Sequence, residues 1–100
     1  MQIQDLTESS FAPLQGTTCK LYVADEAPAV EFEIAEVSRA GQPRDGFRTP
    51  FTVLFLGPPG RHVPQGTYRL EHERLGRLDL FLVPIGPEPS GRHRYEAVFT

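Results

Sequence analysis

The sequence contains one cysteine, no asparagine and no long apolar segment. Because Cys19 stands alone, an intramolecular disulfide is excluded, and without asparagine there is no N-glycosylation site. Residues 1–5 lack the basic and apolar regions of a signal peptide, and no apolar stretch approaches the ~20 residues of a membrane helix. We therefore expect a cytoplasmic protein that has no membrane partner.

The chain also lacks the strong positive charge that nucleic-acid binding requires. It has 10 Lys and Arg against 13 Asp and Glu, a net charge of −3 at pH 7. A nucleic-acid footprint needs a markedly basic face, so we expect no nucleic-acid partner. A length of 100 residues suits one domain with one modest core, which we place over residues 1–100.

Apolar and polar residues alternate along most of the chain, as in half-buried β-strands. The pattern predicts six strands, at residues 19–23, 30–34, 51–56, 67–72, 78–85 and 92–99. A change of phase at Ala35-Glu36-Val37 indicates a bulge or a strand end. Residues 25–28 form a predicted turn, and residues 38–49 the longest predicted loop. Before the strands, residues 5–14 predict a short helical turn that Thr7 can cap.

No predicted helix is long enough to connect parallel strands, so the strands must pair antiparallel. We predict an all-β fold, either a small six-stranded barrel or a compact sandwich, with the N-terminal helical turn closing one end. Strands four and five should form one hairpin, and strands five and six another.

Strands three and five are apolar on both faces, in a chain too short to cover all of them. Phe51, Val53 and Phe55 alternate with Leu54 and Leu56, and Leu78, Leu80 and Leu82 alternate with Phe81, Val83 and Ile85. One face of each strand fills the core, and the other must be covered by loops, stay exposed, or bind a partner. The candidate interface residues are Val53, Phe55, Phe81, Val83 and Ile85. We expect the partner to be another protein or a second copy of this chain.

The residues of catalytic and metal sites do not form recognisable motifs. Cys19 is in phase with buried positions, which favours an inert apolar role. Three histidines, His62, His72 and His93, lack metal-ligand spacing. Glu31 and Glu33 share the polar side of a strand, which is typical of solvated charge. We therefore expect no catalytic residue, no metal and no cofactor.

Two other functions remain as alternatives. A small-ligand-binding barrel would line a pocket with aromatic residues such as Phe32, Phe55 and Tyr68. A small enzyme would use His72 and His93 with nearby carboxylates, if strands four and six brought these histidines together.

Several segments carry a family resemblance that covers nearly the whole chain. The most specific are Pro50-Phe51-Thr52-Val53-Leu54-Phe55 and Gln65-Gly66-Thr67-Tyr68. The chain resembles a family of small uncharacterised bacterial proteins of about this length, a domain of unknown function. The resemblance brings no catalytic residues. Genes of such proteins often lie beside tail-collar or tail-fibre-like genes of phage type, which implies a structural or accessory role.

Overall fold

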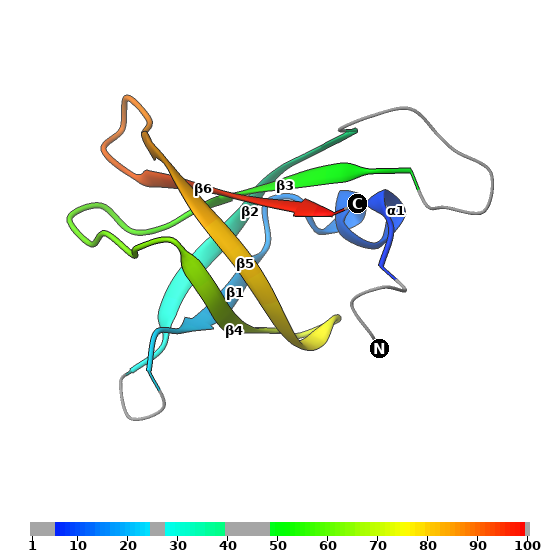
Figure 1. Cartoon of the computed structure of the whole chain (residues 1–100), viewed down its shortest axis with the longest axis horizontal. Coiled ribbons are helices and arrows are strands. Elements are labelled where there is room, and N and C mark those ends of the chain that lie inside the picture. The colour runs from blue at the N-terminus through cyan, green and yellow to red at the C-terminus, as the bar shows by residue number, and fades with distance from the viewer. Residues whose placement is uncertain (1–5, 25–27, 40–48, 100) are drawn as a thin grey trace.

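The computed structural model describes residues 6–24, 28–39 and 49–99 (Figure 1). The elements, in chain order, are α1 (Glu8–Phe11), the 3-10 helix η2 (Ala12–Leu14), β1 (Thr18–Tyr22), β2 (Val30–Arg39), β3 (Phe51–Leu56), β4 (Gly66–His72), β5 (Gly76–Pro87) and β6 (His93–Phe99). Most of the predicted turn at 25–28 and most of the predicted loop at 38–49 lie outside the described residues.

The six strands form a closed barrel in the order β1-β2-β3-β6-β5-β4, and all of their pairings are antiparallel. The prediction of a mainly antiparallel all-β fold is confirmed, and the barrel rather than the sandwich is the form adopted. The predicted pairings of β4 with β5 and of β5 with β6 are also confirmed. Closure pairs β1 with β4, so that every strand has two neighbours and no edge is left unpaired.

Residues at every second position of the strands point into the barrel, as the sequence pattern predicts. The largest fully buried side chains include Leu21, Phe32, Ile34, Phe51, Val53, Phe55, Leu80, Leu82 and Tyr95. The Phe32 and Tyr95 rings lie 4.9 Å apart between their centroids, and the Phe51 and Phe99 rings stack at 4.5 Å. Aromatic side chains therefore fill much of the interior.

Strand β2 continues beyond its predicted end. The register of β2 against β3 shifts between Ile34 and Glu36, so of the two structures that the phase change indicated, a bulge or a strand end, the bulge is the one present. Beyond the bulge the strand runs on to Arg39, so that Ser38 and Arg39 belong to the strand and not to the following loop. An extra residue at a bulge lets the strand bend, and bending helps a small sheet to close.

The N-terminal helical turn closes one end of the barrel. Thr7 is the N-cap of α1, and its backbone N–H donates to the Ser10 hydroxyl at 3.0 Å. The Phe11 ring lies 5.9 Å from the Phe51 ring and 5.3 Å from the Phe99 ring, at the ends of β3 and β6 that meet α1 (Figure 1). Among the described residues, no helix has the length and apolar character needed to cross a membrane.

Candidate functional site

The outer surface of β5 and β6 carries the most exposed large apolar side chains of the described chain. The exposed fraction is 52% for Phe81, 39% for Ile85 and 56% for Val98. Val83 is half-buried on the same side of β5. We call the surface made by these four residues the β5–β6 face.

The strand register brings these side chains together with Leu54 of β3. Val83 lies opposite Glu96, and Glu96 lies opposite Leu54. Side chains two residues apart on a strand point the same way. Phe81 therefore lies beside Val83 on the outer side of β5, and Val98 lies beside Glu96 on the outer side of β6. Neighbouring strands are ~4.8 Å apart, so the apolar side chains form one continuous surface across three strands.

Two of the predicted interface residues belong elsewhere. Val53 and Phe55 are both 0% exposed, inside the barrel core. The prediction placed them beside Phe81 and Val83, and this was wrong because the odd-numbered residues of β3 point inward. Leu54, on the outward side of the same strand, replaces them. Val98 was also missed, although its position between buried Ala97 and Phe99 could have identified it as outward-facing.

Ile85 reaches the surface through an irregularity in β5. The register of β5 against β6 shifts between Pro84 and Pro87, and Gly86 takes the left-handed conformation at φ +95°. The Arg94 guanidinium donates to the carbonyl oxygens of Gly86, at 3.3 Å, and of Ile85, at 3.4 Å. The bulge is therefore held by a side chain of the neighbouring strand, which keeps Ile85 at the end of the β5–β6 face.

A second feature is a hollow of about 360 Å³ on a different part of the barrel. It is lined by Thr18, Cys19, Lys20, Glu31, Glu71, His72 and Glu73. Three carboxylates and one amine make its lining acidic. Glu31 lines the hollow, whereas Glu33 is engaged with Arg92, so the two glutamates of the predicted solvated pair have separate surroundings.

Cys19 and His72 border this hollow but do not form a nucleophile with a base. Burial, with a further contribution from the negative charge of Glu31, raises the pKa of the Cys19 thiol to about 12. Cys19 is 4% exposed, as its predicted apolar role requires. The His72 Nδ1 atom accepts the Arg74 backbone N–H at 2.9 Å, and Nε2 lies 2.9 Å from the Thr17 hydroxyl. Both ring nitrogens are therefore engaged in structural hydrogen bonds.

His72 and His93 lie on strands that are not neighbours. His72 is opposite Gly76 at one end of β5, and His93 is opposite Pro87 at the other end. Gly76 and Pro87 are eleven residues apart along β5, so at ~3.3 Å per residue about 36 Å of strand separates the levels of the two histidines. The condition for a joint site of His72 and His93 is thus not met. His93 instead lies against His62, with 5.7 Å between the ring centroids.

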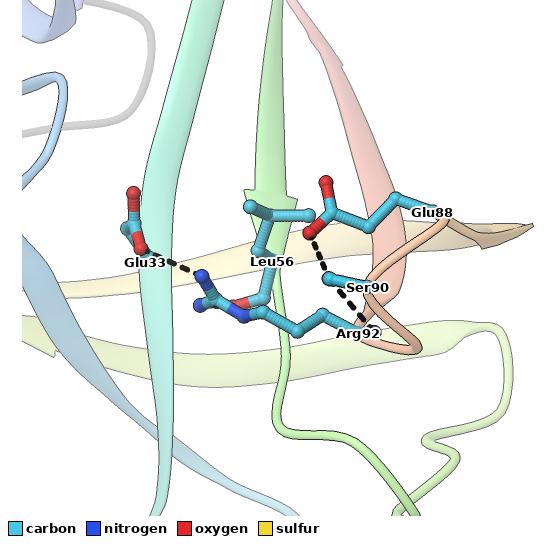
Figure 2. Close-up of polar contacts among 5 residues, drawn as sticks. All are labelled: Glu33, Leu56, Glu88, Ser90 and Arg92. Atoms are coloured by element: carbon cyan, nitrogen blue, oxygen red, sulfur yellow. Dashed lines mark hydrogen bonds and ion pairs between the residues drawn. The ribbon is translucent and has the colours of Figure 1, made fainter.

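The loop between β5 and β6 is linked by Arg92 across the end of β3 to β2. Figure 2 shows this side chain extending past Leu56 toward Glu33 of β2. Its Nη1 atom lies 2.9 Å from Glu33 Oε1, and Nη2 donates to the Leu56 carbonyl oxygen at 3.5 Å. Within the loop, the Ser90 hydroxyl donates to the Glu88 carboxylate. Arg92 is thus a structural link.

The aromatic residues that were candidates for a ligand pocket pack against the core. Phe32 and Phe55 are both 0% exposed, and Tyr68 is partly buried with its hydroxyl donating to the Pro64 carbonyl at 2.5 Å. Within residues 6–24, 28–39 and 49–99, no group of three or more His, Cys, Asp or Glu side chains has the arrangement of a metal site. Among these features, the β5–β6 face is the one without intramolecular cover.

The comparisons with known proteins give one match. The family model described as a domain of unknown function (DUF6916) matches residues 6–99. No curated protein and no solved structure matches the chain.

Proposed function

Because the chain belongs to the DUF6916 family, whose description assigns no activity, we propose a function from its surface: it is a non-enzymatic module that binds another protein through the β5–β6 face. The observation that carries the proposal is the exposure of Phe81, Val98 and Ile85 in one continuous area. Contiguous exposed apolar surface is costly in water and marks interaction sites more often than chance. Aromatic side chains, phenylalanine included, are also enriched in the buried cores of protein interfaces.

The two alternatives have less support. A ligand-binding barrel needs an opening among its aromatic residues, whereas Phe32 packs on Tyr95 within the core. An enzyme built on His72 needs a free ring nitrogen, whereas both of its nitrogens have partners. The β5–β6 face requires no rearrangement of this kind before a partner can bind.

The family resemblance adds a class of partner to the proposal. We assign the module to the cytoplasm, as an accessory to tail-collar or tail-fibre-type proteins of phage origin. This assignment comes from the resemblance alone, and the identity of captured partners tests it separately from the binding surface.

The test is capture of partners from the source cells by the tagged full chain, with variants as bait. Phe81→Glu places a charge in the centre of the face, and we expect it to weaken the binding of a specific partner at least about tenfold. Ala29→Glu is the matched control, because it adds the same charge at an exposed position before β2, across the barrel from β5.

Circular dichroism and light scattering on each variant verify the fold and the mass. The proposal fails if every protein retained by the wild type is retained equally by the Phe81→Glu variant. It is supported when a partner is lost from Phe81→Glu and kept by Ala29→Glu.

A further inference from the structure

A single carboxylate lies in the middle of the apolar surface. Glu96 is half-buried on the outer side of β6, between Val83 of β5 and Leu54 of β3. Val98 lies two residues along β6 on the same side. Glu96 therefore has apolar neighbours on three sides.

Glu96 has no hydrogen-bond or ion-pair partner among the described residues, whereas several other glutamates of the barrel do. Glu33 pairs with Arg92, Glu8 with Arg39, and Glu71 accepts from the Tyr22 hydroxyl. The nearest basic residue on the same side of β6 is Arg94, whose guanidinium is bound to the carbonyls of Ile85 and Gly86.

An occupant of the β5–β6 face would remove water from Glu96. A carboxylate that loses water without gaining a partner is strongly unfavourable, so the occupant must supply a positive charge at this point. A second copy of this chain, docked by the same face, would bring another Glu96 and no free cation on that face. Its net charge of −3 adds repulsion.

We infer that the β5–β6 face binds a segment of another protein in which an arginine flanked by apolar residues pairs with Glu96. This inference rests on the proposed function and names the chemistry of its partner. Arginine suits the position better than lysine, because its planar guanidinium binds a carboxylate through two hydrogen bonds and is only weakly hydrated. The flanking apolar residues cover Phe81, Val98 and Leu54.

The test is selection of short random peptides, displayed on phage particles, on the immobilised full chain. Peptides that depend on the face are those that bind the wild type and not a Phe81→Ser variant. We expect these to be enriched in arginine next to apolar residues. Their affinity should fall at least about tenfold on Glu96→Gln. Glu73→Gln removes the same charge from the hollow and should leave affinity unchanged.

A second arm replaces the selected arginine by citrulline, which has the same shape without the charge. This change should weaken binding of the peptide to the wild type by a similar factor. It should have little further effect on binding to the Glu96→Gln variant, because both changes remove the same arginine–carboxylate interaction. The wild-type half of this arm alters only the peptide, so it can be measured even if the Glu96→Gln variant does not fold.

The outcomes separate the two proposals. The inference is overturned, and the proposed function left in place, if the face-dependent peptides lack arginine. The same holds if neither Glu96→Gln nor the citrulline replacement changes their affinity. If no peptide depends on Phe81, both fail. A wild-type chain that sediments as a dimer and becomes monomeric on Val98→Ser would also overturn the inference, because a second copy would then be the occupant.

Discussion

The Nε2 atom of His72 lies 2.9 Å from the hydroxyl oxygen of Thr17, although the two residues are 55 positions apart in the chain. His72 Nδ1 accepts the Arg74 backbone N–H, so the ring proton resides on Nε2, which donates to Thr17. The Thr17 hydroxyl in turn donates to the Leu14 carbonyl at 2.6 Å. This chain of bonds joins the end of β4 to the segment that follows the N-terminal helical turn.

The neutral form of His72 is the one that fits this chain of bonds, and stability should therefore fall in mild acid. Burial, and to a lesser degree the positive charge of Arg74, lowers the pKa of His72 below its ordinary 6.5, while Glu73 opposes the shift. Below pH 6.5 the unfolded chain binds the proton more readily than the folded chain. The stability that His72 contributes is complete above this pH and is lost as pH falls toward the lowered value.

The measurement is the urea unfolding midpoint of the wild type and of His72→Gln across pH 5 to 8. We expect the advantage of the wild type over the variant to shrink below about pH 6.5, because glutamine does not titrate. His62→Gln is the control, since it replaces a histidine at an exposed position by the same residue. Parallel profiles for wild type and His72→Gln would refute this role.

Gly57 follows β3 at a point where two aromatic rings leave no space for a side chain. A Cβ atom there would lie 2.9 Å from Tyr95 Cε2 and 3.2 Å from Phe32 Cε1. Both rings are fully buried, so neither can move freely. We expect Gly57→Ala to cost about 1–3 kcal/mol of unfolding free energy, as overpacked cores do.

Gly66→Ala is the matched control for this substitution. Its Cβ would meet Tyr68 no closer than 3.4 Å, which is ordinary contact. Thermal unfolding compares the two variants, and for a domain of this size 1 kcal/mol shifts the midpoint by about 4–8 °C. Equal midpoints for Gly57→Ala and Gly66→Ala would show that the Tyr95 and Phe32 rings move aside to admit the added methyl group.

Tyr95 combines a buried ring with a hydroxyl that satisfies the backbone. The Val63 backbone N–H donates to this hydroxyl at 2.9 Å, and Tyr95 is 0% exposed. Tyr95→Phe preserves the ring and leaves a buried N–H without its acceptor, so we expect a loss of about 1–3 kcal/mol by urea unfolding. Tyr22→Phe, which removes a hydroxyl bonded to Glu71, should change the midpoint little because water can replace that bond. A stable Tyr95→Phe variant would mean that Val63 finds another acceptor.

The sequence contains enough information for the barrel but not for all of its surface. Alternation of Val30, Phe32 and Ile34 identifies the first part of β2, and the phase change at Ala35 indicates a bulge or a strand end without deciding between them. In a strand that is apolar on both faces, such as β3, the pattern cannot say which face is inside, and this is why Val53 and Phe55 were assigned to the surface.

Contacts set by closure and by loops were also beyond the sequence pattern. His62 lies in a loop whose sequence has no periodic pattern, so nothing in the sequence indicated its contact with His93. The bond between His72 and Thr17 depends on how β1 and β4 meet, and that pairing joins strands far apart in the chain. Glu96, by contrast, lies on a strand that was predicted, but its isolation among apolar neighbours follows only from the register of β6 with β3 and β5.

Cys19 provides a direct measure of how tightly the β1 side of the barrel is closed. With its pKa raised to about 12, chiefly by burial, the thiol is almost entirely protonated at pH 8 in the folded chain. In the unfolded chain, where the thiol pKa is about 8.5, roughly a quarter is ionised. Because thiolate is the reactive form, alkylation by iodoacetamide at pH 8 should be at least about a hundredfold slower in the native protein than in guanidinium chloride. Mass spectrometry at timed intervals gives both rates. Native alkylation within tenfold of the unfolded rate would mean that the barrel opens at β1 often enough to expose the thiol, and the inert role assigned to Cys19 would then be wrong.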